Sequence, residues 1–144
     1  MFKSTFSVTS AAAQVAMDAA CQEASANGWK VTIAIADAGG VPILVNRCDG
    51  AFPASFEIAV GKAKTAAQFH KPTGVLEDAA NVSSDGSSRT ALLSAPFILM
   101  RGGLPIFAND VCVGAVGVSG VKPNEDEQVA TAAVNALNAI ISKL

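Results

Sequence analysis

Hydrophobic and polar positions follow two repeats along the chain, one with helical spacing and one with strand alternation. Helical spacing predicts long helices over residues 9–27 and 53–70, and a third near the C-terminus with a buried stripe from Val129 onward. Asn124 and Glu127 are predicted to be the N-cap of that last helix and its partner. The predicted buried face of the second helix comprises Phe52, Phe56, Ala59, Ala63, Ala66 and Ala67.

Strand alternation marks two predicted hairpins. The first joins residues 31–36 to residues 41–49 through a turn that contains two glycines, which reach positive φ without penalty. The second joins residues 104–108 to residues 111–119 through Asn109-Asp110, a pair that tolerates the left-handed conformations of a two-residue turn.

The stretch between the second helix and the second hairpin is predicted to be less regular. Short helical turns over 73–80 and 87–95 flank a loop over 81–86, and 97–100 is predicted to be a short apolar strand. The order is therefore helix, hairpin, helix, short turns, a hairpin or three-stranded meander, and a final helix. This order predicts a single α+β domain over residues 1–144, with an antiparallel sheet covered by helices.

Composition adds an expectation about association. Hydrophobic residues make up 51% of the chain and charged residues 15%, which excludes an intrinsically disordered protein. So few charges leave apolar surface that we expect to be buried between the subunits of a homo-oligomer. The net charge of −2 comes without a basic stripe that could neutralise phosphates, so nucleic-acid binding is not expected.

The cysteines and the first residues indicate a cellular compartment. Cys21, Cys48 and Cys112 are odd in number and form no CxxC pair, which is typical of free thiols in a reducing environment. Residues 1–10 lack the basic and apolar regions of a signal peptide. No apolar run approaches the roughly 20 residues that span a bilayer. We therefore expect a cytoplasmic protein that does not bind membranes.

Two familiar catalytic or binding motifs fail on their spacing. Gly61-Lys62 resembles the end of a P-loop, but Ala63 stands where serine or threonine is needed, and the pair lies inside a predicted helix. The run from Gly117 to Gly120 is one residue short of a nucleophile elbow. Neither phosphate binding by a P-loop nor serine-hydrolase chemistry is therefore predicted.

Three side chains remain as candidates for chemistry, and each has a structural alternative. His70, the only histidine, is either a helix-terminal residue favoured by the helix dipole or a group that binds a ligand. Lys62, inside an alanine-rich helix, is either paired or extended to solvent, or it contacts an anionic ligand. Arg101 directly precedes Gly102-Gly103, where it could meet the same ligand beside exposed glycine amides.

The second hairpin is predicted to place two glycine-containing segments together. Antiparallel pairing brings residues 101–104 beside residues 117–120. At this predicted ligand site Arg101 supplies positive charge, Ser119 supplies a hydroxyl, and the glycines supply backbone N–H groups. The acidic stretch 125–127 could pair with Arg101. The structural alternative is that both glycine segments serve only close packing.

A series of short motifs runs in order along nearly the whole chain. They are VTIAIADAGG at 31–40, RCDG at 47–50, KAKTAAQF at 62–69, PT at 72–73, GGLPI at 102–106, VGAVGVSG at 113–120 and EDEQ at 125–128. Together they resemble the GlcG/HbpS-like family, also called the haem-degrading domain family, which is related to the C-terminal domain of PduO-type cobalamin adenosyltransferases. The single residues that match the family pattern are Lys62, Thr65, Gly102, Gly103, Pro105, Ser119 and Asp126. Cys48 and His70-Lys71 depart from it.

The resemblance implies a profilin-like, three-layer α/β/α fold, with a five-stranded antiparallel sheet flanked by helices, and it implies homo-oligomers. Members of the family include an extracellular haem-binding redox sensor, a glycolate-operon protein of unclear role and a domain fused to a cobalamin adenosyltransferase. Haem or a cobalamin-type tetrapyrrole is therefore a candidate cofactor. No haem ligand of the family maps onto this chain through a matching motif.

We therefore predict an oligomeric, cytoplasmic binding or accessory protein for a tetrapyrrole or a small anionic metabolite. Its predicted ligand-binding residues are Lys62, His70, Arg101, Gly102, Gly103, Ser119 and Gly120. The second hypothesis is an enzyme that uses Lys62 as an acid, a base or a carbonyl-reactive group, although no nucleophile–base set is visible. The third is a purely structural subunit. No metal site is predicted, because one histidine and scattered cysteines do not form a closed zinc site.

Overall fold

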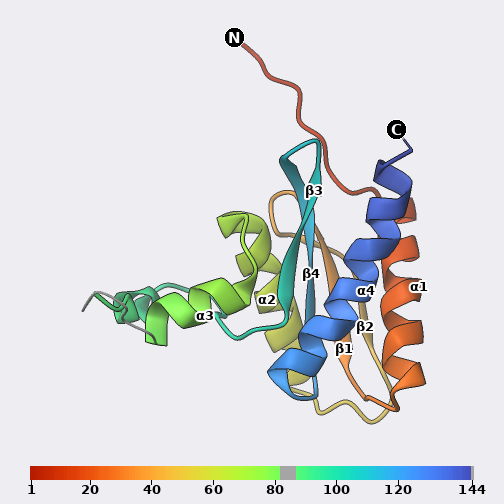
Figure 1. Ribbon diagram of the computed structural model, residues 1–144, viewed down its shortest axis with the longest axis vertical. Coiled ribbons are helices and arrows are strands. Elements are labelled where there is room, and N and C mark those ends of the chain that lie inside the picture. Colours follow the sequence, from red (N-terminus) through yellow and green to blue (C-terminus); the bar gives the residue numbers. More distant parts are fainter. Residues whose placement is uncertain (82–86, 144) are drawn as a thin grey trace.

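A computed structural model describes residues 1–81 and 87–143 of the chain (Figure 1). Its elements, in chain order, are α1 (Ser10–Ala26), β1 (Thr32–Asp37), β2 (Pro42–Arg47), α2 (Ser55–Phe69), α3 (Thr73–Asn81), the 3₁₀-helix η1 (Thr90–Ser94), β3 (Gly103–Ala108), β4 (Val111–Ser119) and α4 (Pro123–Ile141). The three long helices and the two hairpins predicted from the sequence are all present. The loop predicted over 81–86 lies, apart from its first residue, outside the described residues.

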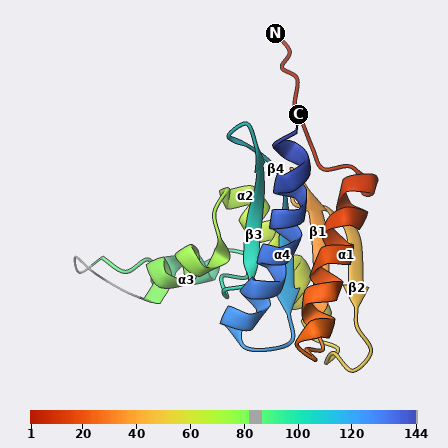
Figure 2. The same ribbon diagram turned by 45° about the vertical axis from the view of Figure 1, so that its right-hand side comes forward.

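The sheet has the strand order β2-β1-β4-β3, and every neighbouring pair is antiparallel. The helices α1 and α4 lie side by side on one face, and α2 covers the other (Figure 1, Figure 2). The helix α3 and η1 form a projection beside the sheet. The α+β class is therefore confirmed, and the described residues form four strands rather than the five that the family resemblance implied. Among those residues, no helix is long and apolar enough to cross a bilayer.

The missing fifth strand falls on residues 97–100, which are irregular. The backbone N–H of Ile98 donates to the Thr65 hydroxyl on α2 at 3.0 Å, so this segment bonds to a helix side chain. The Phe97 ring packs edge-on against Phe69, with 4.9 Å between the ring centroids. Leu99 is buried against α3. The apolar residues that suggested a strand instead seal the joint between α2 and the α3 projection.

Small residues set the distance between α2 and the sheet. Ala59 and Ala63 of α2 pack directly on Ala34 and Ala36 of β1. Gly117 of β4 lies beneath the α2 backbone, where a Cβ would collide with the Ala59 carbonyl oxygen. Larger side chains fill the opposite layer, under α1 and α4, and the largest fully buried ones there are Ile33, Ile35, Ile106, Val116, Val118 and Val129.

Two local predictions about helices are wrong. The N-cap of α4 is Lys122, not Asn124, because Pro123 with its fixed φ occupies the first helical turn. The Glu125 carboxylate accepts a hydrogen bond from the Lys122 backbone N–H at 3.2 Å, as the third residue of a capping box does. Phe52 and Phe56 were expected on the buried face of α2, but both are about half exposed. The helix starts at Ser55, and its buried face carries Ser55, Lys62 and Thr65 together with four alanines.

Candidate functional site

The second hairpin does bring the two glycine-containing segments together. Asn109 and Asp110 adopt left-handed φ values of 50° and 65°, as a two-residue hairpin turn requires. The register shifts by one residue between Ile106 and Phe107, and beyond that shift Gly103 lies opposite Gly117. The Val118 N–H also donates to the Gly102 carbonyl at 3.0 Å. Residues 101–104 therefore lie beside the end of β4, as the sequence predicted.

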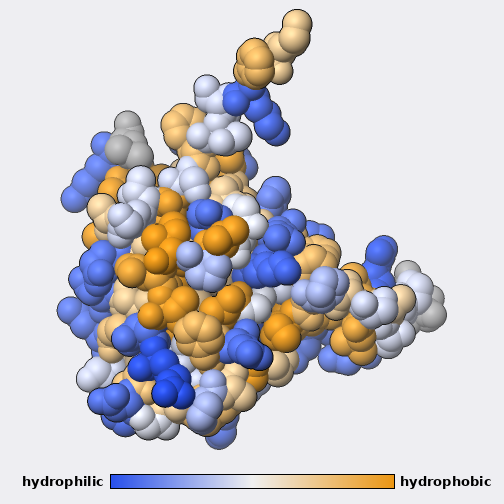
Figure 3. All heavy atoms as spheres, turned by 180° about the vertical axis from the view of Figure 1, so that it is seen from behind, coloured by the Kyte–Doolittle hydropathy of each residue, from blue (hydrophilic) through white to orange (hydrophobic). Residues whose placement is uncertain are grey.

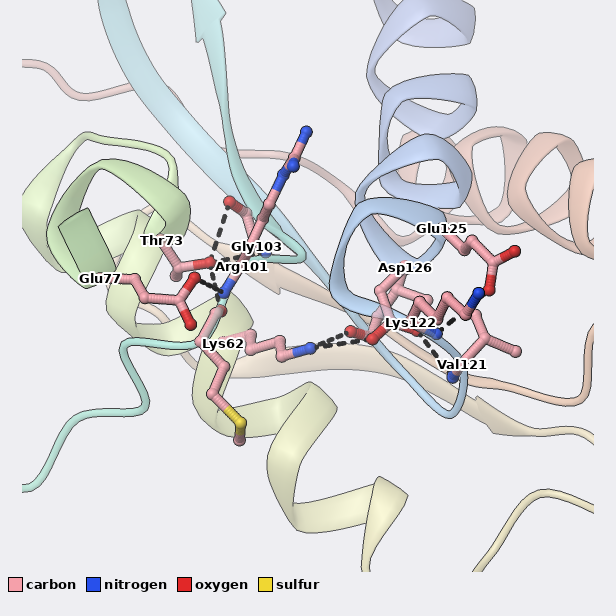
Figure 4. A network of polar contacts seen from close by, with 11 residues as sticks. Lys62, Thr73, Glu77, Arg101, Gly103, Val121, Lys122, Glu125 and Asp126 are labelled. Atoms are coloured by element: carbon pink, nitrogen blue, oxygen red, sulfur yellow. Dashed lines mark hydrogen bonds and ion pairs between the residues drawn. The ribbon is translucent and has the colours of Figure 1, made fainter. Parts of the chain in front are cut away.

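A buried ion pair lies directly under this junction (Figure 4). The Lys62 ammonium, on the sheet side of α2, donates to the Val118 carbonyl at 2.8 Å and to Asp126 Oδ2 at 3.2 Å. The other oxygen of Asp126 accepts a hydrogen bond from the Val121 N–H at 3.1 Å. Both charged side chains are only 3% exposed. The pair thus ties the middle of α2 to the end of β4 and to the first turn of α4.

Burial and pairing act in opposite directions on the two charges. Burial lowers the pKa of Lys62 below its ordinary value, and the neighbouring Asp126 carboxylate opposes that shift. Burial raises the pKa of Asp126, and this is opposed by the Lys62 charge and by the Val121 N–H. Lys62 therefore has the lowered pKa that suits an acid–base group, but almost no surface at which a substrate could meet it.

Gly102 and Gly103 are packing positions around that pair. Gly102 has φ 127°, and a Cβ there would lie 2.8 Å from the Lys62 ammonium nitrogen. The Gly103 N–H donates to the Thr73 hydroxyl at 2.8 Å, and this hydroxyl donates to the Met100 carbonyl at 2.7 Å. Both glycines are buried. The expectation that missing side chains leave the Gly103 amide free for a ligand is therefore wrong, because Thr73 occupies it.

Arg101 lies on the outer side of the junction. Its guanidinium donates to Glu127 Oε1 at 2.9 Å, which confirms the predicted pairing with the acidic start of α4. Its backbone N–H donates to Glu77 Oε2 of α3 at 3.3 Å. The hydrogen bond and the charge of Glu127 raise the pKa of Arg101 further. The arginine side chain is still 45% exposed, so part of its donor set remains open to a ligand.

Arg101 forms part of the wall of a cleft of about 610 Å³ between α3, the start of β3 and the start of α4. The lining residues are Pro72, Gly74, Val75, Glu77, Asp78, Arg101, Leu104, Pro123, Asn124 and Glu127. The volume lies within the range of small-molecule sites. One arginine faces three carboxylates in this wall, so the cleft is not a simple anion site.

The other predicted site residues do not line this cleft. Ser119 is buried at the end of β4 and pairs with Thr32 of β1. Gly120 has φ 147°, and a Cβ there would lie 2.5 Å from the Lys30 carbonyl oxygen, so it is a packing glycine. His70 is an exposed residue with φ 56° that ends α2. Ser119 therefore lies near Arg101 along the backbone but, like His70, outside the lining of the cleft.

Three residues that make contacts in this region were not among the site residues predicted from the sequence. Thr73 and Glu77 come from α3, whose position beside β3 depends on tertiary packing. Asp126 was placed only within the acidic stretch 125–127, although it lies three residues before Val129 on the buried stripe of α4. That spacing could have identified it as the buried member of the acidic run. Among the described residues, no cluster of His, Cys, Asp and Glu could hold a metal ion.

The sequence and the fold of this chain are both similar to those of known proteins. The family model of haem-degrading HbpS-like proteins matches residues 8–135. Protein GlcG of Escherichia coli strain K12 is 37% identical over 99 residues, which cover 68% of this chain and 70% of GlcG. The crystal structure of Klebsiella pneumoniae protein ORFY has a TM-score of 0.88 at 30% identity, covering 96% of this chain and 95% of that one. The crystal structure of a PduOC–haem complex has a TM-score of 0.82 at 25% identity, covering 92% and 96%.

Proposed function

The chain belongs to the HbpS-like family of haem-degrading proteins, and we propose that it is an oligomeric binding or accessory protein for a small carboxylate. The observation that carries this proposal is the half-exposed Arg101 guanidinium in the wall of the 610 Å³ cleft. Glu127 binds one edge of the guanidinium, which fixes the side chain and leaves its remaining donors partly exposed at the cleft wall.

The acidic wall restricts which carboxylates suit the cleft. Glu77, Asp78 and Glu127 all line it together with Arg101. A dianion brought there meets one positive group and three negative ones. A molecule with a single carboxylate brings Arg101 a partner with only one negative charge to be repelled, and an ammonium group on its remainder is attracted by the acidic wall. The proposed ligand is therefore a monocarboxylate, and a zwitterion fits better than a dicarboxylate.

Haem is implied by the family and by the PduOC–haem complex, so its fit can be tested against the cleft. Haem iron takes its axial ligand from histidine, cysteine, methionine or tyrosine, and none of these is among the lining residues. The haem propionates would also meet the three carboxylates. The cleft does not fit haem, and His70, the only histidine, ends α2 without lining it.

Association into oligomers has its own support. Seen from behind, hydrophobic residues gather over the β1–β2 hairpin and the first turns of α2 (Figure 3). Val41, Phe52 and Phe56 are all large apolar residues that remain exposed in the single chain. Contiguous apolar surface of this kind typically marks a protein–protein contact. We infer that a second subunit covers it.

Ligand titrations followed by thermal shift and calorimetry test the proposal. The probes are propionate, alanine as a zwitterion, succinate as a dicarboxylate, and haem and cobalamin with detection by visible absorption. Alanine or propionate should bind and raise the melting temperature, since a ligand that binds only the folded state stabilises it. Arg101→Ala should abolish that binding, whereas Arg47→Ala, an exposed arginine on β2, should leave it unchanged. Glu127→Gln, which keeps Arg101 and removes one negative charge, should improve succinate binding.

Two results contradict the proposal. Unchanged affinity in a folded Arg101→Ala variant would remove the arginine from the site. If haem or cobalamin binds tightly and its affinity is unchanged in Arg101→Ala, the ligand site lies outside this cleft. The variant His70→Ala would then show whether the histidine ligates the haem iron.

A further inference from the structure

The first residues of the chain form an apolar arm that leaves the body of the protein. The chain is fixed at Val8, whose N–H donates to the Val113 carbonyl at 2.8 Å. The Val8 side chain also packs over Gly114, where a Cβ would lie 2.7 Å from it. Residues 1–6, here called the N-terminal arm, extend beyond this point into solvent (Figure 1, Figure 2). Within the arm Phe2 is 100% exposed and Phe6 is 70% exposed.

An apolar pocket of about 320 Å³ opens where the arm leaves the body. It is formed by the chain around Val8, by the β3–β4 hairpin and by the C-terminal end of α4. The lining residues are Phe6, Ser7, Val8, Thr9, Ala12, Ile106, Ala108, Asn109, Val111, Val113, Leu137, Ile140 and Ile141. None of them carries a charge, and the polar groups are limited to two hydroxyls and one amide. The pocket therefore suits an aromatic or aliphatic side chain.

We propose that Phe2 of one subunit inserts into this pocket of a second copy of the chain. An exposed phenylalanine and an open apolar pocket occur a few residues apart on the same surface, and burial of both is favourable in water. Phe2 lies four positions from Phe6, which gives the arm a reach of roughly 13 Å. A neighbouring copy whose pocket lies within that distance can receive it.

The arm favours a second copy over its own pocket. Phe6 and Val8 already line the pocket of their own subunit, so Phe2 could enter only by reversing the chain direction. The intervening residues, Lys3-Ser4-Thr5, contain no glycine, the residue that reaches the positive φ of a tight turn without cost. Exchange between two copies needs no reversal. It also forms an isologous contact, in which each subunit gives an arm and receives one.

The first experiment measures self-association by sedimentation velocity over a dilution series, with Phe2→Ser and its matched control Lys3→Ser. Lys3 lies next to Phe2 in the same exposed arm but brings no apolar side chain. Phe2→Ser should weaken association at least tenfold, and Lys3→Ser should leave it unchanged. Equal association of the wild type and Phe2→Ser would overturn the proposal, and so would an equal loss in both variants. A lower melting temperature for Phe2→Ser with unchanged association would indicate insertion into its own pocket, which also overturns it.

The second experiment mixes a variant that lacks the inserting residue with a variant that lacks the pocket. Val111 lines the pocket and is 48% exposed, so Val111→Glu places a charge at the pocket without disturbing the core. Each variant alone should associate weakly. In an equimolar mixture, the intact arm of Val111→Glu can enter the intact pocket of Phe2→Ser, so the mixed pair should associate more tightly than either variant alone. If the mixture associates no more tightly than Phe2→Ser or Val111→Glu alone, arm exchange is contradicted. This is also the result expected if the pocket binds a small apolar molecule instead of Phe2.

Discussion

Replacing Lys62 by methionine removes one partner of the buried ion pair and keeps the length of the side chain. Asp126 would then hold a negative charge at 3% exposure, with Oδ2 facing a thioether instead of an ammonium. The Val118 carbonyl would lose its charged donor as well. Breaking a buried pair by removal of one partner costs about 3–5 kcal/mol, a large part of the ~5–15 kcal/mol that holds a domain folded.

The double variant Lys62→Met/Asp126→Asn separates charge from packing. It leaves no buried charge, and the asparagine oxygen can still accept the hydrogen bond from the Val121 N–H. We expect the double variant to be more stable than Lys62→Met alone and to lie within about 2 kcal/mol of the wild type, since exchange of a buried pair for neutral groups is often close to neutral. The two substitutions should therefore couple by at least about 2 kcal/mol, as contacting residues do.

Urea unfolding followed by circular dichroism measures these differences, with Lys71→Met as the control because Lys71 is exposed. The control should change the free energy of unfolding by no more than about 0.5 kcal/mol. A loss below about 1 kcal/mol in Lys62→Met, or a double variant as unstable as the sum of the two single variants, would refute the view that this pair is a buried structural tie.

Three further predictions follow from the same structure. Burial raises the pKa of Asp126, so the folded state holds the proton at a pH where the unfolded state has lost it. The contribution of Asp126 to stability should therefore fall as the pH rises from about 4. Between pH 4 and pH 6, the free energy of unfolding of the wild type should decrease relative to that of Asp126→Asn. Gly102→Ala should destabilise more than Gly28→Ala, because φ 127° is less accessible to an L residue than φ 69° and because only Gly102 would bring a Cβ within 3 Å of other atoms; equal losses in thermal melts would contradict this. Phe56→Glu should dissociate the oligomer, and light scattering that finds a stable 14.5 kDa wild-type monomer at micromolar concentration would contradict the oligomer itself.

The regular elements were predictable because their signals are local. Strand alternation and the Asn109-Asp110 turn are sufficient to predict the second hairpin, and hence the meeting of residues 101–104 with the end of β4. The register shift between Ile106 and Phe107 leaves no such local signal. The alternative weighed for Lys62, pairing rather than exposure to a ligand, is what the structure shows. The oligomeric state, the cytoplasmic location and the role of each site residue stay predictions.

The remaining features depend on contacts between segments far apart in the chain. Residues 97–100 have the apolar pattern of a strand, but their use depends on the Thr65 hydroxyl, which binds the Ile98 N–H across 33 positions. The acidic wall of the cleft likewise appears only when α3 docks beside Arg101 and brings Glu77 with it. Local periodicity carries no information about such docking, so Arg101 was predicted with the acidic start of α4 as a partner but without the α3 carboxylates Glu77 and Asp78.

The strand order β2-β1-β4-β3 has a consequence for how the chain reaches its native state. Each outer strand is joined to its inner neighbour by a short turn, so both hairpins can form rapidly by local search. The sheet becomes continuous only when β1 pairs with β4, which closes a loop that contains β2, α2, α3 and β3. Closing so long a loop loses chain entropy before the contacts across it are gained. We therefore expect the pairing of the two hairpins to be the slow step of folding. The ion pair between Lys62 and Asp126, 64 positions apart, stabilises the product of this step. Mutations along β1 and β4 should slow refolding more than mutations in α3.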